Sequence, residues 1–340
     1  MIPDPLRKND CVGFGNKSIV YKVKPTIVVK TAHNQSSKTE EHPFDRELEF
    51  YKCLHKRQDR CPHIIECFLA LPDHLFLSYC NLNRIDLRYS ENQEREERSN
   101  GFPGRLIRVK NYEDPALIAR WIQQITSALE YVEKMGFSHN DLHPRNCLLD
   151  HNLNLKLCDF DRTATIGQFL EGVFAPWARK LVTGPLKGSY GLCCARTEQF
   201  AVGTLLYFMV YGHEPYEDID LAKQNPGELS ERFGNMEFPE LNRHEVFDEF
   251  ISACWHNVYP TMALVAYDFK RKTKDIALNA ECEIVNYTEE RKACETLIQE
   301  GLLGPDLAFR FQPTWQRYLY VFAGKAAFIW QSLVNALRRL

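Results

Sequence analysis

The sequence predicts an α+β fold in two parts, a small β-rich part at the N-terminus and a larger, mostly helical part after it. Short apolar runs separated by glycine and proline turns fill residues 10–80. From residue 114 onward, apolar residues recur at the spacing of helices. A densely charged stretch at 84–100 separates the two patterns. We therefore expect domains at 1–80 and 81–290, and a helical C-terminal extension at 291–340.

The N-terminal part begins with strand-like runs. Residues 10–31 have the pattern of strand, glycine turn, strand and strand, with a turn at Lys24-Pro25 before the last strand. A helix is expected next, because apolar residues recur there as a single stripe: Phe44, Leu48, Tyr51 and Leu54. Two apolar runs at 63–69 and 75–80, joined by a proline turn, predict a hairpin.

The larger part is predicted to be mostly helical. The charged stretch 84–100 is expected to form a solvated connection between the two parts. The helix after it is clearly marked, because Asp114 suits an N-cap, Pro115 suits the first helical position and Gly136 ends the apolar stripe. We expect short strands at 146–159, irregular structure to about 197, a buried helix at 198–211 and further helices to the end.

Charge and composition restrict the class of partner. The 340 residues carry 42 lysines and arginines against 45 aspartates and glutamates, a net charge of −3, which argues against an electrostatic nucleic-acid binder. No apolar window reaches the ~18–20 residues of a transmembrane helix, and the N-terminus has no apolar stretch to serve as an export signal. The 12 cysteines are then expected to be reduced, in a cytoplasmic or nuclear protein.

The last segment, 314–340, has apolar residues at helical spacing and ends close to two arginines. Packing against the larger part is the simpler expectation, because long apolar stripes on helices usually face a core. Peripheral binding to a membrane surface or to a partner protein is the alternative.

A turn with glycines between the first two strands is the first chemical signal. Gly13 and Gly15 have no side chain and Ser18 has a small one, so backbone amides there can approach a phosphate. Val20 can cover an adenine ring. A plain hairpin turn explains the same pattern, so the order of the motifs that follow decides between the two.

Charged and amide residues follow this turn in a fixed order. Lys30 ends an apolar strand and Glu47 lies on the next predicted helix, where an ion pair can hold phosphate oxygens in place. After the long helix come His139-Asn-Asp-Leu-His-Pro-Arg-Asn146, a short apolar strand, and Asp159-Phe-Asp161. Oxygen-bearing side chains are thus placed around a pair of short strands.

From about Asp10 to Asp268 the sequence resembles the protein kinase superfamily. GFGNKSIVYKV resembles the glycine-rich loop, IVVK the strand with the ATP-binding lysine, HNDLHPRN the catalytic loop and DFD the magnesium-binding segment. TEQFAVGTLLYFMVYGHEPYED is similar to the buried helix that follows the activation segment. The resemblance implies the bilobal kinase fold, with a β-rich smaller lobe.

The resemblance also implies a role for each matching residue. Asp141 would accept or orient the attacking hydroxyl, and Asn146 and Asp159 would hold Mg²⁺. Lys30, paired with Glu47, would contact the α- and β-phosphates of ATP. Leu77 would be the gatekeeper, and Ser78, Tyr79, Cys80 and Asn81 would form the hinge whose backbone hydrogen-bonds adenine. The implied reaction transfers the γ-phosphate of ATP to a hydroxyl, with serine or threonine of a protein favoured as acceptor.

Several positions depart from the family pattern. Asn140 replaces an arginine that usually pairs with a phosphate on the activation segment, so we expect activity without that phosphorylation. Asp161 replaces a glycine, and the sequence does not decide whether it binds cations or impedes the active conformation. Glu198 replaces an aspartate. An ion pair is lost at both ends, at Leu186 and Tyr259, which indicates a rewired lobe rather than decay.

Two other functions stay open. D-L-H-P-x-N is also similar to the loop of aminoglycoside and choline phosphotransferases, which phosphorylate small alcohols, although the other motifs favour a protein kinase. The departures at Asn140, Asp161 and Leu186 suit a non-catalytic pseudokinase that works as a binding module. The complete set of phosphate and metal residues favours an enzyme.

Two pairs of residues have a second interpretation. His139 and His143 are spaced like metal ligands, but the resemblance favours a structural His139 packed beneath the metal-binding segment. The adjacent Cys193 and Cys194 could be redox-sensitive, although a buried, inert pair is the simpler expectation.

Overall fold

The computed structural model describes residues 3–33, 42–97, 104–219, 226–278, 285–312 and 314. The packing predicted for segment 314–340 lies outside the described residues, except for Thr314. The chain forms two compact units. The sheet unit comprises residues 1–40, 67–79 and 284–340, and the helical unit comprises residues 41–66 and 80–283. The described residues from 285 onward therefore belong with the N-terminal strands.

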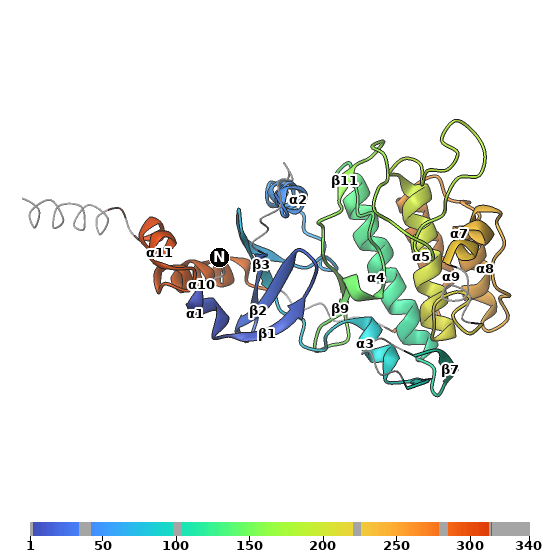
Figure 1. Ribbon diagram of the computed structural model, residues 1–340, viewed down its shortest axis with the longest axis horizontal. Coiled ribbons are helices and arrows are strands. Elements are labelled where there is room, and N and C mark those ends of the chain that lie inside the picture. The colour runs from blue at the N-terminus through green and yellow to red at the C-terminus, as the bar shows by residue number, and fades with distance from the viewer. Residues whose placement is uncertain are drawn as a thin grey trace, which may run out of the picture. The chain divides into compact units, whose positions relative to one another are not determined.

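The described part of the sheet unit is built on a five-stranded antiparallel sheet in the order β1-β2-β3-β5-β4 (Figure 1). Its strands are β1 (Asp10–Phe14), β2 (Ser18–Lys24), β3 (Ile27–Ala32), β4 (Cys67–Leu71) and β5 (His74–Ser78). The predicted run of strand, glycine turn, strand and strand is confirmed, and so is the hairpin of β4 and β5. The α+β fold class is confirmed as well.

The strand register separates the side chains of this sheet onto two faces. One row of directly paired residues crosses the sheet on the first face: Gly13, Val20, Lys30 and Leu75. The neighbouring row points to the second face, because successive side chains of a strand alternate: Tyr21, Val29 and Phe76. The face that carries the predicted ATP-binding lysine is therefore not the face on which the core of this unit forms.

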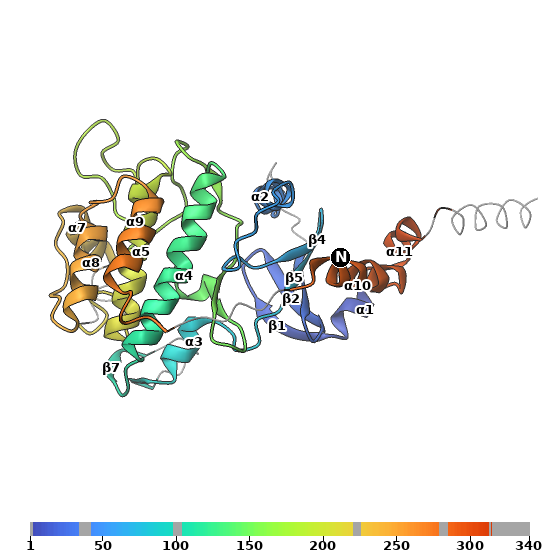
Figure 2. The same ribbon diagram turned by 180° about the vertical axis from the view of Figure 1, so that it is seen from behind.

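Helices from both ends of the chain cover the second face. α1 (Asp4–Arg7) precedes the first strand, whereas α10 (Tyr287–Gln299) and α11 (Pro305–Phe311) come much later in the sequence. Figure 2 shows α10 beside α1 and the strands. Apolar side chains from all these parts form one buried cluster: Leu6, Tyr21, Ile27, Val29, Phe68, Leu69, Phe76, Cys294, Ile298 and Leu303. The start and the end of the described chain thus close the same core.

The helical unit is centred on α4 (Pro115–Lys134) and α5 (Ala195–Tyr211). As predicted, the Asp114 carboxylate caps α4 by accepting from the amide of Ala116 at 2.8 Å. α5 is buried along its length, because its sequence is apolar on nearly all sides. α8 (Glu245–Trp255) packs on α5, and α9 (Met262–Lys272) packs on α4 (Figure 1). Further helices are α2 (Asp45–His55), α3 (Ile85–Ser90) and α7 (Pro226–Gly234).

The prediction of a solvated connection at 84–100 is wrong over most of its length. Residues 85–90 form α3, and β6 (Gln93–Arg95) pairs with β7 (Leu106–Val109). Ile85 and Tyr89, four residues apart, bury one side of α3. Most of the charged side chains described there form ion pairs, for example Arg88 with Glu113 at 2.6 Å. Dense charge of both signs therefore indicates an ordered surface with many ion pairs here. Residues 98–103 lie outside the described ranges.

Residues 159–194, the activation segment of the predicted kinase, have a small core of their own. The segment is closed at its base by backbone hydrogen bonds from Gly167 to Cys193 at 2.9 Å and from Cys193 to Gln168 at 2.8 Å. Above this base, a separate buried cluster forms from Ala164, Leu170, Val173, Ala178 and Cys193. Local apolar contacts and backbone hydrogen bonds thus order this segment.

Within the described ranges, no helix is both long enough and apolar enough to cross a membrane. The cysteines in those ranges are all free thiols. Burial raises the pKa of Cys193 to about 11, so this thiol is protonated near neutral pH.

Candidate active site

The predicted catalytic loop lies between α4 and two short strand pairs. After α4 the chain turns at Gly136, which has a φ of +85°, and enters β8 (Phe137–Ser138), which pairs with β11 (Ala164–Thr165). The loop then runs from 139 through a 3₁₀ turn at Pro144–Asn146 into β9 (Cys147–Leu149), which pairs with β10 (Leu155–Leu157). Both ends of the loop are therefore fixed by strand pairing.

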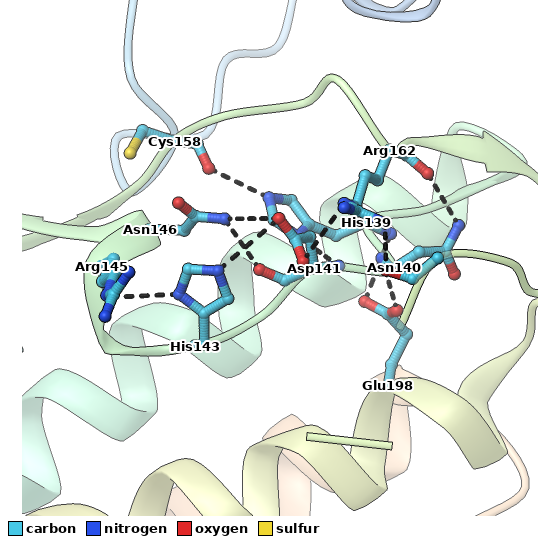
Figure 3. A network of polar contacts seen from close by, with 10 residues as sticks. His139, Asn140, Asp141, His143, Arg145, Asn146, Cys158, Arg162 and Glu198 are labelled. Atoms are coloured by element: carbon cyan, nitrogen blue, oxygen red, sulfur yellow. Dashed lines mark hydrogen bonds and ion pairs between the residues drawn. The ribbon is translucent and has the colours of Figure 1, made fainter. Parts of the chain in front are cut away.

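The carboxylate of Glu198, on the first turn of α5, anchors this loop from below (Figure 3). It accepts from the Ser138 hydroxyl at 2.8 Å, the His139 amide at 3.3 Å and the Asn140 amide at 2.9 Å. Glu198 is 4% exposed, so these three groups have little access to water and depend on it. The longer side chain in place of aspartate is therefore accommodated.

Asp141, the acid of the loop, has several polar neighbours (Figure 3). The Asn146 amide donates to its backbone carbonyl at 2.9 Å and to its Oδ2 at 3.1 Å. His143 Nε2 lies 3.6 Å from the same Oδ2, and Arg162 Nε lies 3.5 Å from Oδ1. Both carboxylate oxygens are thus oriented by neighbours.

The surroundings of Asp141 keep its carboxyl ionised. Burial acts to raise its pKa. A hydrogen bond and positive charge from His143 act against burial, with smaller contributions from the charges of His139 and Arg162. These effects outweigh burial, so the pKa of Asp141 lies below its ordinary value. An ionised carboxylate at this point can accept a proton.

Asn146 and Asp159 have the chemistry that a magnesium site requires. The Asn146 nitrogen is used in its two bonds to Asp141, which leaves the carboxamide oxygen as the atom for a cation. Asp159 follows β10 closely and has a φ of +66°. No group of three or more His, Cys, Asp or Glu side chains in the described ranges gathers as a metal site. The pair fits Mg²⁺, which takes few protein ligands beside substrate phosphates.

The aromatic ring between the two acids of Asp159-Phe-Asp161 is fully buried in the helical unit. Phe160 stacks on Phe50 of α2, with ring centroids 3.9 Å apart, and meets the ring of His139 edge-on at 5.0 Å. His139 Nε2 also lies 3.1 Å from the carbonyl oxygen of Cys158. His139 therefore has the packing expected of a structural residue, and α2, which carries the buried Glu47, is held against this segment.

The remaining predicted site residues, apart from Cys80, lie in the sheet unit. The glycine turn is tight, because the amide of Gly15 donates to the carbonyl of Ser18 at 2.9 Å. Val20 is paired with Lys30 across β2 and β3, so the two side chains share a face. A side chain at position 13 would press on Val20, since a Cβ there would lie 3.3 Å from the Val20 side chain. Position 13 therefore suits glycine, and the contact of this turn with a nucleotide stays a prediction.

The predicted hinge begins at the end of β5. Leu77 pairs with Val28 of β3, and Ser78 pairs with Ile27. The amide of Tyr79 donates to the carbonyl of Thr26 at 2.9 Å. Cys80, the next residue, is the first of this stretch in the helical unit. The hinge positions therefore lie where the chain passes from one unit to the other.

The structure brings the predicted residues together in two groups. Asp141 and Asn146 are hydrogen-bonded in the helical unit, and Val20 and Lys30 are paired in the sheet unit. Glu47 belongs to the helical unit and Lys30 to the sheet unit. Their predicted ion pair, and the roles of the individual residues in ATP binding, stay predictions.

Sequence reasoning missed one residue of this site, Arg162. Its guanidinium contacts Asp141, although its position in the sequence, directly after Asp161, follows the magnesium-binding segment rather than the catalytic loop. The sequence did contain a signal. Position 140 lacks the usual arginine, and an arginine stands at position 162, directly after Asp159-Phe-Asp161.

At Tyr259, one of the two positions at which the family's ion pair is lost, other polar contacts are present. The Tyr259 hydroxyl donates to Asp268 Oδ2 at 2.7 Å. The backbone of Tyr259 exchanges two hydrogen bonds with the Gln199 side chain, at 2.6 and 3.1 Å. Polar groups of α5 and α9 thus hold the segment 256–261 without an arginine at position 259.

Comparisons with known proteins agree with this arrangement. A family profile for the protein kinase domain matches residues 6–260. The tyrosine-protein kinase ABL2 of Homo sapiens is 29% identical over 256 residues, which cover 72% of this chain and 19% of that protein. The tyrosine-protein kinase transforming protein Abl of Abelson murine leukemia virus is 33% identical over 166 residues, 47% of this chain and 22% of that protein.

A serine/threonine kinase is similar to a comparable degree. The serine/threonine-protein kinase ULK3 of Xenopus laevis is 27% identical over 239 residues, which cover 65% of this chain and 44% of that protein. The chain thus spans less than half the length of each of these relatives, and it matches both tyrosine and serine/threonine kinases. With the family profile covering most of its length, the chain belongs to the protein kinase domain family.

Proposed function

We propose that this chain is an active, Mg²⁺-dependent protein kinase that transfers the γ-phosphate of ATP to a serine or threonine hydroxyl of a protein. The observation that carries the proposal is the state of Asp141. Its carboxylate is oriented through both oxygens and ionised. A binding module without activity has no need for an acid held in this way.

In the proposed reaction, the acceptor hydroxyl oxygen attacks the γ-phosphorus, and the bond to the β,γ-bridging oxygen breaks in line with it. Asp141 orients the hydroxyl and accepts its proton. Lys30 offsets negative charge on the α- and β-phosphates, and amides of the turn at 13–18 contact phosphate oxygens. Mg²⁺, which Asn146 and Asp159 would hold, supplies positive charge to the phosphates when it is bound.

His143 supports serine or threonine as acceptor. Serine/threonine kinases usually carry a lysine two positions after the catalytic aspartate, and this chain departs from that pattern by having a histidine there. His143 takes that position and approaches the carboxylate of Asp141 to 3.6 Å. The imidazole thus places a hydrogen-bonding nitrogen beside the Asp141 carboxylate, where those kinases place the lysine nitrogen.

The test is phosphate transfer from labelled ATP with Mg²⁺ to a peptide array containing serine, threonine and tyrosine acceptors. Asp141→Asn keeps the size and loses the base, so we expect at least about a hundredfold loss of turnover. Asp275→Asn, which alters an 85% exposed carboxylate, is the matched control and keeps full turnover.

Three results would contradict the proposal in different ways. ATP binding without turnover, unchanged in Asp141→Asn, indicates a pseudokinase. Transfer only to added aminoglycosides or choline indicates a small-molecule kinase. Transfer only to tyrosine keeps the activity and corrects the acceptor.

A further inference from the structure

The cation that is missing from the catalytic loop is replaced by one from another segment. Position 140, directly before the catalytic aspartate, is an asparagine with a φ of +66°. Asparagine tolerates this left-handed backbone better than most residues do. It brings no positive charge, and the guanidinium that reaches Asp141 comes instead from Arg162, with Nε 3.5 Å from Oδ1 (Figure 3).

Asn140 itself holds the segment that supplies this charge. Its side-chain nitrogen donates to the backbone carbonyl of Arg162 at 3.2 Å and to that of Ser138 at 3.1 Å. One amide therefore joins the catalytic loop to the first residue after Asp161. Asn140, which stands where the family usually has a charged arginine, therefore holds the backbone of Arg162, which carries the charge.

A second contact fixes the far end of the Arg162 side chain. Its Nη1 donates to the carbonyl of Gly172, within the same activation segment. Gly172 has a φ of +70°, and a Cβ at this position would collide with the guanidinium. The glycine thus serves both the backbone conformation and the approach of the arginine. Arg162 is only 35% exposed and Asp141 20% exposed, so their attraction is less screened than that of a surface pair.

We propose that Arg162 is a positioning residue, which orients the Asp141 carboxylate and links it to the conformation of the activation segment. The inference rests on the proposed kinase function. A guanidinium stays charged throughout the physiological pH range, so this link needs no phosphate. The same geometry has an opposite interpretation, in which Arg162 covers Asp141 and must leave before a hydroxyl can bind. The two interpretations predict opposite changes in turnover.

Steady-state kinetics with the full chain separates them. In Arg162→Gln we expect kcat to fall about tenfold or more, because a small misplacement of a reacting group has a large effect on rate. KM for ATP stays within about twofold, since Arg162 contacts Asp141 and is not among the residues expected to contact ATP. Arg162→Lys keeps the charge without the planar fork and recovers part of kcat. Gly172→Ala leaves Arg162 in the sequence but displaces it, and lowers kcat in the same direction.

Arg108→Gln is the control, because Arg108 is 70% exposed and pairs with Glu94 on the β6–β7 hairpin. It leaves kcat unchanged. Wild-type protein treated with phosphatase also keeps its kcat. An unchanged or increased kcat in Arg162→Gln, or loss of wild-type activity after phosphatase treatment, overturns the inference while the kinase function stands.

Hydrogen exchange gives a readout that does not depend on turnover. If Arg162 joins the two segments, Arg162→Gln increases exchange both in the catalytic loop, 138–146, and in residues 163–173. Equal exchange in the variant and the wild type contradicts the link. A wild type without turnover contradicts the proposed function, and the exchange result then still decides whether the two segments are coupled.

Discussion

Each of the two units of this chain is stabilised internally by a different kind of contact. The core of the sheet unit is an apolar cluster, to which the end of the chain contributes Cys294, Ile298 and Leu303. The helical unit also has apolar helices at its centre, but its catalytic loop is fixed by buried polar groups such as Glu198. Apolar contacts tolerate small shifts, whereas hydrogen bonds fix direction. The polar contacts lie where geometry matters for chemistry.

Removing the C-terminal helices tests the apolar side of this comparison and has the largest expected effect. A chain that ends after residue 283 lacks α10 and α11 and uncovers one face of the sheet. Each buried aliphatic side chain lost from a core costs about 2–5 kcal/mol, so several together exceed the stability of a small unit. We expect β1 to β5 to become sensitive to protease, as read by mass spectrometry of the fragments.

A chain that ends after residue 314 is the control, because it keeps the complete cluster. Protection of the strands in this control and their cleavage in the shorter chain are expected. Equal protection of the strands in both chains would show that the helices are dispensable for the sheet.

Glu198→Ala tests the polar side and has the next largest effect. It removes the acceptor of three buried donors, at 2.8, 2.9 and 3.3 Å. We expect unfolding by urea to show a loss of about 3–5 kcal/mol, and turnover to fall as the loop loses its anchor. Glu198→Gln keeps one acceptor and has a smaller effect. A loss below about 1 kcal/mol in Glu198→Ala would mean that apolar packing, rather than the carboxylate, holds the loop.

Glu214 is a polar group of the helical unit whose surroundings disfavour its charged form. Burial, together with the nearby charge of Glu217, raises its pKa from 4.5 to about 7. The folded state then binds a proton that the unfolded state releases, so stability falls as pH rises from about 4.5 through about 7. Glu214→Gln removes this loss, and we expect it to be stabilising at pH ~8 by about 1–3 kcal/mol and nearly neutral at pH ~4.

Thermal unfolding at several pH values measures the effect of Glu214→Gln. The control is Glu231→Gln, which alters an exposed glutamate of the same unit and leaves the pH profile unchanged. A stabilisation by Glu214→Gln that is equal at low and high pH contradicts a titrating carboxyl.

Tyr259→Phe has the smallest expected effect, because it removes a single hydrogen bond, to Asp268 at 2.7 Å, and keeps the ring. We expect a loss of about 1 kcal/mol in urea unfolding and unchanged kcat. A much larger loss would mean that this bond belongs to a cooperative network with the neighbouring residues.

Much of the fold and part of the site could be predicted, because their signals are local. The cap at Asp114, the apolar stripe of α4 and the alternating strands each depend on neighbours in sequence. α3 was missed because charged residues surround its two buried side chains, Ile85 and Tyr89. Periodicity gives the face of a helix but not its partner, so the packing of α10 on the sheet could not be read from residues 287–299.

The contact of Arg162 with Asp141 could not be predicted for a related reason. It joins two residues that are not neighbours in sequence. It also depends on Gly172, which leaves room for the Arg162 side chain from ten residues earlier in the chain. The missing arginine at 140 indicated a loss of charge. Only the folded chain shows where the charge was replaced.

The contribution of α10 to the sheet core also sets an order of events during synthesis. The five strands of the sheet unit end at Ser78. Ile298 and Leu303, which complete the core of that unit, are made after the whole helical unit. At about 5–20 residues per second, the ribosome needs roughly 10–40 s to add residues 79–286. The strands are therefore made well before the residues that complete their core. During that interval the apolar face of the strands lacks the later side chains that cover it, Cys294, Ile298 and Leu303.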